Sequence, residues 1–173
     1  MMPKPLQPMA TKLLHLAAIL ALASSTACSH APVNPGAQLE LGTGSWRFEP
    51  LEDGQPVELV AGVQGGWHVW ISLRVSDLGR DPRPIHLTIQ PSDESAEADE
   101  MRIALPFDPP RDDGTRQLVG YTGIVSNPSC WVGELVRLRA TMELPAGEVL
   151  VAERDVTLLG GVYPPPACTE SLR

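Results

Sequence analysis

Histidine is scarce in this chain, although it is the residue type most often used for metal binding and for proton transfer near neutral pH. Of the four histidines in 173 residues, only His68 and His86 lie beyond residue 30. A zinc site needs three or four converging histidine, cysteine or carboxylate ligands, and no two cysteines or histidines here have the spacing of a zinc motif. We therefore predict no metal site and no cofactor.

Motifs that position a nucleophile or a phosphate are also missing from the sequence. It contains no Gly-x-Ser-x-Gly segment and neither a phosphate-binding loop nor a dinucleotide fingerprint. A pair of carboxylates acting as acid and base is the one catalytic set that the 21 acidic residues leave open. We predict that the protein is not an enzyme, and a small hydrolase with such a carboxylate pair is the alternative.

Tryptophan is the residue type that stands out, with four copies against two tyrosines and two phenylalanines. In segment 67–75, Trp67, Val69 and Ile71 begin an unbroken apolar series on one face of a strand, so His68 and Trp70 lie on the other face. An outward-facing tryptophan is a common anchor for sugars or protein partners. We predict that Trp70 and His68 mark a contact surface; the alternative is that the N-terminal tether or a loop covers Trp70.

The first 27 residues have the form of a bacterial signal peptide. Lys4 and Lys12 supply the positive charges, 13–23 is an apolar core, and small residues follow up to Ala27. The apolar core is shorter than the roughly 20 residues that a membrane-spanning helix requires. The sequence therefore predicts export, which places the remaining chain where disulfides persist.

The junction Ser25-Thr26-Ala27-Cys28 resembles the lipobox of bacterial lipoproteins, although Ser25 stands where that family usually has leucine. The resemblance implies that Cys28 is the first mature residue and carries a lipid that anchors the chain to a membrane. Ser29, the next residue, is not acidic, which by the family's sorting rule implies the outer membrane. The alternative is ordinary cleavage after Ala23 or Ala27, which would leave a secreted or periplasmic protein.

The other two cysteines, Cys130 and Cys168, are predicted to form a disulfide. They flank a predicted hairpin of two strands, 134–144 and 148–159. Antiparallel pairing brings the outer ends of such strands to the same end of the domain, so the chain can close the bond.

Composition narrows the range of partners. The formal net charge of −8 argues against nucleic acid as a partner, since nucleic acid needs a basic patch, and against electrostatic docking to anionic lipid.

Glycine and proline residues are scattered at short intervals along the chain, and no segment has a convincing helical period.

These patterns predict an all-β fold: a two-sheet antiparallel sandwich, immunoglobulin-like, of about seven or eight strands, with a jelly roll or small barrel as the alternative. Strand 85–89 is expected either to form a hairpin with 67–75 or to lie in the other sheet. Arg154 interrupts the apolar face of the last strand, so a bulge or strand end is expected there. The predicted organisation is a signal peptide at 1–27, a lipidated flexible tether at 28–43, the sandwich domain at 44–160 and a C-terminal tail at 161–173.

The segment Gly65-Gly66-Trp67-His68 is similar to the strand opening of some small bacterial lipoproteins, a resemblance that brings no activity with it. Taken together, the sequence predicts a noncatalytic cell-envelope lipoprotein. It would be a binding or assembly module on a lipid tether, with a protein or polysaccharide partner in the envelope. The alternative is a small envelope hydrolase whose carboxylate pair the sequence does not identify.

Overall fold

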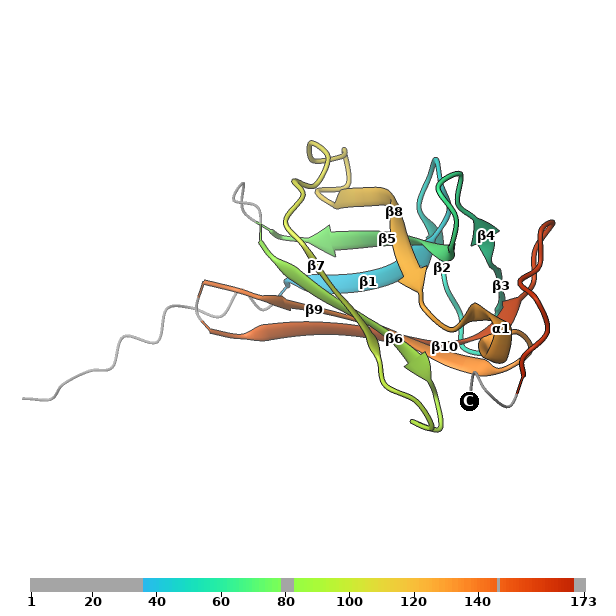
Figure 1. Ribbon diagram of the computed structural model, residues 1–173. Helices are drawn as coiled ribbons and strands as arrows, with labels where there is room; N and C mark the ends of the chain where they lie inside the picture. The colour runs from blue at the N-terminus through green and yellow to red at the C-terminus, as the bar shows by residue number, and fades with distance from the viewer. Residues whose placement is uncertain (1–35, 79–82, 146, 170–173) are drawn as a thin grey trace, which may run out of the picture.

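Ten strands and one short helix, α1 (Pro128–Trp131), make up the described part of the chain (Figure 1). The structure is a computed structural model that describes residues 36–78, 83–145 and 147–169. The predicted signal peptide and the predicted lipidation site, Cys28, lie outside these residues. Within the described ranges, no helix has the length and apolar character needed to cross a bilayer.

The first sheet is built around its longest members, β5 (Trp67–Ser76) and β8 (Arg116–Val125), which pair antiparallel. Since β8 pairs along one edge of β5, two shorter strands share the other edge. These are β1 (Gln38–Thr43), on the C-terminal half of β5, and β4 (Val60–Ala61), on its first two residues. The strand β2 (Glu49–Pro50) extends the sheet beyond β1.

The second sheet has the order β3-β10-β9-β6-β7. Its members are β3 (Pro56–Glu58), β6 (Ile85–Pro91), β7 (Asp99–Ile103), β9 (Leu135–Glu143) and β10 (Val149–Leu159). The predicted last hairpin is confirmed as β9 and β10, whose register runs from Glu143↔Val149 to Leu135↔Thr157. All pairs in this sheet are antiparallel except β3 with β10, which is parallel.

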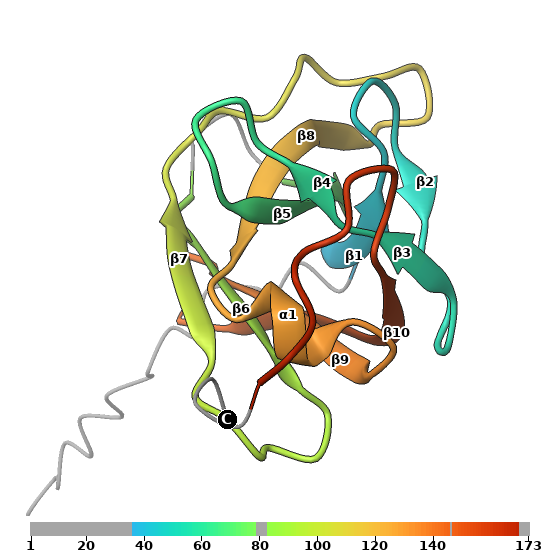
Figure 2. The same ribbon diagram turned by 45° about the vertical axis from the view of Figure 1, so that its right-hand side comes forward.

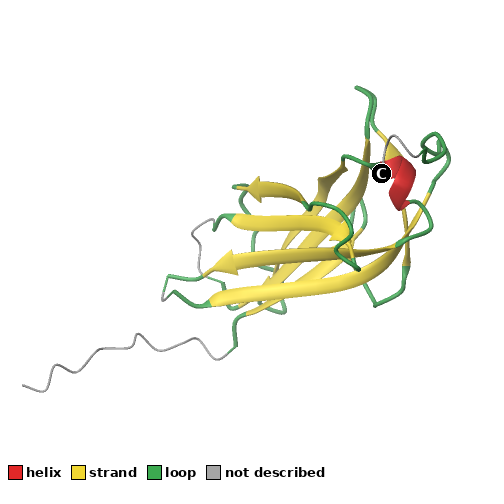
Figure 3. Ribbon diagram, turned by 60° about the horizontal axis from the view of Figure 1, so that its bottom comes forward, coloured by secondary structure: helices red, strands yellow, loops and turns green. Residues whose placement is uncertain are grey.

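The two sheets pack face to face and do not close into a barrel, which confirms the predicted all-β sandwich. Figure 3 shows the described chain as strands and loops with the single short helix. The predicted alternation holds on the main strands, since the inward residues of β5, β6 and β9 are buried. They are Val69, Ile71, Leu73, Val75, Ile85, Leu87, Ile89, Val136, Leu138, Ala140 and Met142.

Strands β5 and β6 belong to different sheets, so of the two arrangements expected for 67–75 and 85–89 the second is correct. His68 and His86 therefore do not share a surface. His86 instead lies 3.3 Å from Glu100, across the β6–β7 pair.

The prediction of a flexible tether reaching residue 43 is wrong for its last part. Leu39 and Leu41 are buried and alternate with Gln38 and Glu40, so 38–43 forms β1 and pairs with β5. The sandwich domain begins at Gln38 rather than at residue 44. The strand was missed because it is short and directly follows a segment rich in alanine, proline and glycine that has no periodic pattern.

The expected bulge at Arg154 is also absent, because β10 keeps an unbroken register with β9 through the Arg154↔Leu138 pair. The arginine is accommodated by hydrogen bonding instead. Its Nε donates to the carbonyl oxygen of Leu51 at 2.9 Å, and one terminal nitrogen donates to the carbonyl oxygen of Glu153. A polar side chain at an inward position thus reaches main-chain acceptors without breaking the strand.

The predicted disulfide is present, with Cys130 and Cys168 at a Cα–Cα distance of 4.6 Å. Cys130 lies in α1, so the bond ties the segment after β10 to the helix that precedes β9. Trp67 adds a second link, because its Nε1 donates a hydrogen bond to the carbonyl oxygen of Tyr163 at 3.1 Å. Residues 161–169 are therefore fastened to the sandwich.

Candidate functional site

The outward face of β5 divides into a covered half and an open half. In the covered half, Ser72 is fully buried, and its hydroxyl donates to the carbonyl oxygen of Gly44 at 3.0 Å. The same hydroxyl accepts from the amide of Gly120 at 3.1 Å. The loop between β1 and β2 is thereby held across the sheet, and Phe48 of this loop lies over the guanidinium of Arg74.

A bulge in β8 makes this contact possible. Ile71 pairs with Tyr121 and Leu73 with Leu118, so two residues of β8 stand opposite Ser72. One of them, Gly120, has a φ of +71°, and a Cβ there would lie 2.5 Å from the carbonyl oxygen of Ser45. Only glycine permits both the backbone conformation and the close approach of the loop.

The open half of the same face forms a groove of about 810 Å³, within the range of ligand-binding clefts. Its floor is made by β4, β5 and the end of β8, where Val60, His68 and Ile124 lie in one row across the three strands. Trp70 and Thr122 form the next row. One end is closed by the β4–β5 turn, residues 62–66, and another wall comes from the chain entering α1, residues 126–129.

The apolar side chains of the groove are partly open to solvent. Trp70 is partly exposed, Ile124 is 51 % exposed, and Val63 at the tip of the turn is fully exposed. Gly65 and Gly66 both have positive φ and allow the tight turn that holds Val63 there. The loop therefore presents an apolar residue beside the tryptophan that the sequence singled out.

His68 packs against Trp70 on the same face of β5. It is only 8 % exposed, and its ring meets that of Trp70 edge to face at 4.7 Å between centroids. Its Nε2 is enclosed without a hydrogen-bond partner. Burial lowers the pKa of His68, so the neutral form is favoured. The ring thus acts as an aromatic support for the indole rather than as an exposed acid or base.

The described lining residues of the groove are uncharged, although the carboxylate of Asp99 accepts a hydrogen bond from the amide of the lining residue Ser126 at 2.8 Å. None of its lining residues is an aspartate, glutamate, lysine or arginine, although the whole chain is strongly acidic. Its polar side chains are hydroxyls and amides, among them Gln64, Thr122, Ser126 and Ser129. No pair of carboxylates occurs among these lining residues.

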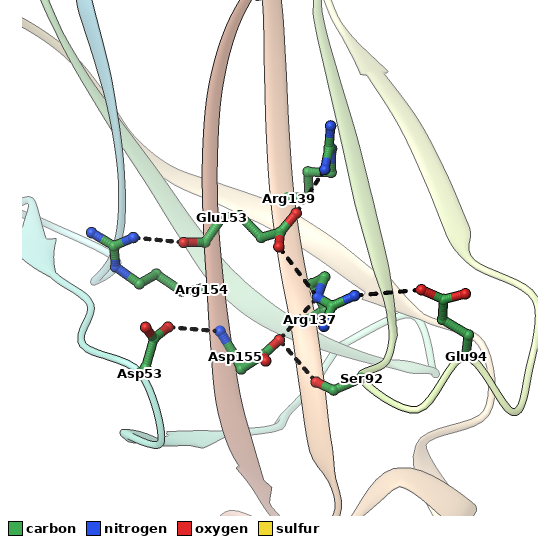
Figure 4. A network of polar contacts seen from close by, with 8 residues as sticks. All are labelled: Asp53, Ser92, Glu94, Arg137, Arg139, Glu153, Arg154 and Asp155. Atoms are coloured by element: carbon green, nitrogen blue, oxygen red, sulfur yellow. Dashed lines mark hydrogen bonds and ion pairs between the residues drawn. The ribbon is translucent and has the colours of Figure 1, made fainter.

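The charged residues of the second sheet gather on its outward face and bind one another (Figure 4). Arg137 is central: its Nε lies 3.1 Å from Asp155 and 3.4 Å from Glu153, and a terminal nitrogen lies 3.5 Å from Glu94. Arg139 pairs with Glu153 at 2.8 Å. Because these groups satisfy one another, this face is a solvated ion-pair network. No cluster of three or more potential metal ligands occurs among the described residues.

The structure brings together both residues that the sequence predicted for a contact surface, Trp70 and His68. His68 is more buried than expected for an outward residue. Sequence reasoning missed Ile124, Thr122 and Val63. The register shift in β8 reverses the alternation that would have identified Ile124 and Thr122, and a loop residue such as Val63 carries no periodic signal.

Figure 2 shows the β4–β5 turn and the β1–β2 loop at the top of the view, while the chain after β10 passes β4 and runs down beside α1. Comparison with known proteins assigns no family to this chain, since no family model, no curated protein and no solved structure matches it significantly.

Proposed function

We propose that this protein is a noncatalytic binding module of the bacterial cell envelope, held by a lipid on Cys28, and that the uncharged groove beside Trp70 receives its partner. The observation that carries the proposal is the combination of a partly exposed tryptophan with a concave, uncharged lining. The immunoglobulin-like relationship and the outer-membrane location remain part of the proposal, with a secreted or periplasmic protein as the alternative.

The position of the groove is compatible with such a tether. Gln38, at the start of β1, pairs with Ser76 at one end of β5, whereas the groove lies over His68 and Trp70 near the other end. Eight residues of extended chain separate Ser76 from His68, which corresponds to about 25 Å. A chain anchored through its N-terminus would present the groove at the end away from the anchor (Figure 1).

The hydrolase alternative has less support. An acid–base pair of carboxylates should lie in a cleft with shifted pKa values. The groove lacks carboxylates among the described residues, and Glu153 and Asp155 on the second sheet are paired with arginines. A binding function therefore fits the geometry better than hydrolysis.

Lipidation is tested by metabolic labelling with a palmitate analogue. We expect the wild-type chain to be labelled and Cys28→Ser to lose the label completely, because this substitution removes the thiol that would carry the lipid. Cys130→Ser serves as the matched control and should keep the label. Equal labelling of the wild-type chain and Cys28→Ser would reject the anchor.

The contact surface is tested by Trp70→Ala in cross-linking from native membranes. Because Trp70 is only partly buried, we expect its loss to destabilise the fold by well under the ~3–5 kcal/mol of a fully buried aromatic. Partner capture should fall strongly. Val151→Ala, an exposed apolar residue on the second sheet, is the control and should change neither quantity. A large drop in melting temperature without loss of capture would return Trp70 to a structural role.

A further inference from the structure

We infer that the ligand of the groove is an uncharged glycan that stacks on Trp70. The inference rests on the proposed binding function and specifies the chemistry of its partner. It combines three properties of the groove: a lining without charged residues, a partly exposed tryptophan, and a rim of neutral hydrogen-bonding side chains.

The first step is the lack of charge. An anionic ligand calls for arginine or lysine, and a cationic ligand calls for carboxylates. The groove offers neither within the described chain, although the protein carries a formal net charge of −8. A charged ligand would lose its hydration on entering this groove and gain no ion pair in return. An uncharged ligand has no such cost.

The second step is Trp70. Its indole is partly exposed, lines the groove and packs edge to face with the ring of His68. Trp46 is 94 % exposed in the β1–β2 loop, but it does not line the groove, and its neighbour Arg47 pairs with Glu49.

Aromatic rings of this kind suit sugars. The C–H bonds on one face of a pyranose ring carry partial positive charge, and the face of an indole is its negative pole, so the two surfaces attract while excluding water. The edge-on packing of His68 restricts the Trp70 ring, which lowers the entropy lost on binding.

The third step is the rim. Gln64, Thr122, Ser126 and Ser129 provide amide and hydroxyl groups at the groove. These groups both donate and accept hydrogen bonds, as sugar hydroxyls do, and they add no charge. Protein-binding hot spots are rich in arginine as well as in aromatic residues, and the groove lining contains no arginine. A glycan is therefore favoured over a protein as the occupant.

The test is calorimetric titration of the full-length protein in lipid nanodiscs, which avoids sugar-based detergents. The ligands are neutral hexasaccharides: cellohexaose, laminarihexaose, maltohexaose, mannohexaose and chitohexaose, each at up to about 5 mM so that weak binding is detected. We expect saturable binding of at least one of them. Its affinity should stay constant between about 50 and 500 mM salt, because no charges pair.

Variants then locate the site. Trp70→Ala is expected to weaken binding about 10- to 30-fold, as for loss of a tryptophan anchor. Val151→Ala should bind as the wild-type chain does. Unchanged affinity in Trp70→Ala would overturn the inference by placing the site elsewhere.

Failure of the inference and failure of the proposed function are distinguishable. If no hexasaccharide binds while Trp70-dependent cross-linking to an envelope protein persists, the glycan is wrong and the binding module stands. If neither is observed, both are wrong. Affinity that falls steeply with salt would also overturn the inference, because it would identify a charged ligand.

Discussion

Replacing both Cys130 and Cys168 with serine is expected to lower the free energy of unfolding by about 4 kcal/mol. The bond closes a loop with a sequence separation of 38 residues, and the chain-entropy model assigns about this value to such a loop. The loss is large against a total stability of roughly 5–15 kcal/mol for an ordinary domain. Urea unfolding of the purified protein under non-reducing conditions measures it.

The expected consequence is local as well as global. The disulfide fixes the segment after β10, whose Tyr163 carbonyl accepts the hydrogen bond from Trp67, a residue at the edge of the groove. Loss of the bond should therefore also change the fluorescence of Trp67. The wild-type chain treated with a reductant should match the double variant. If the double variant unfolded at the same urea concentration as the oxidised wild-type chain, the bond would contribute no stability.

The architecture was largely predictable because period-2 alternation records which side of a strand faces the core. In β5 the inward series Val69, Ile71, Leu73 and Val75 is fully apolar, and all four residues are buried. In β9 and β10 the turn fixes the register, so the hairpin and the closure of the disulfide followed. These features depend on neighbours in the sequence.

Features that depend on distant partners were not predictable in the same way. The strand β1 has only two buried leucines, Leu39 and Leu41, and gains its hydrogen bonds from β5, more than 25 residues away. From the sequence, Arg154 is a charged residue that interrupts an apolar strand face. Only the structure shows that the carbonyl oxygen of Leu51 accepts its hydrogen bond. In both cases tertiary contacts outweighed the local pattern.

In the candidate site, the residues from β5 were predictable from the alternation along that strand, whereas the residues from β8 were not. The parity of β5 placed Trp70 and His68 on the outward face, and the groove contains both. The bulge in β8 decides which of its residues face the groove, and it lies opposite Ser72, whose hydroxyl accepts a hydrogen bond from the amide of Gly120. Parity also placed Ser72 on the polar outward side, where it indeed lies, but it is covered by a loop and fully buried.

Ser72 is accordingly expected to stabilise the fold far more than an outward serine normally does. Replacing Ser72 with alanine leaves the amide of Gly120 and the carbonyl oxygen of Gly44 without their partner. At about 1–2 kcal/mol for each group, the free energy of unfolding should fall by about 2–4 kcal/mol. Chemical denaturation of the two proteins gives the difference.

Ser76 provides a matched control on the same face of the same strand. Its hydroxyl also donates to a carbonyl oxygen, that of Gly36 at 2.9 Å, and accepts from an amide, that of Gln38 at 3.2 Å. Ser76 is partly exposed, so water can replace the lost hydroxyl, and Ser76→Ala should cost less than about 1 kcal/mol. Because Ser72 also fastens the loop that carries Trp46, only Ser72→Ala should make that loop more sensitive to proteolysis. Equal losses of stability in the two variants would contradict this role, since the two serines differ chiefly in whether a loop shields their bonds from water.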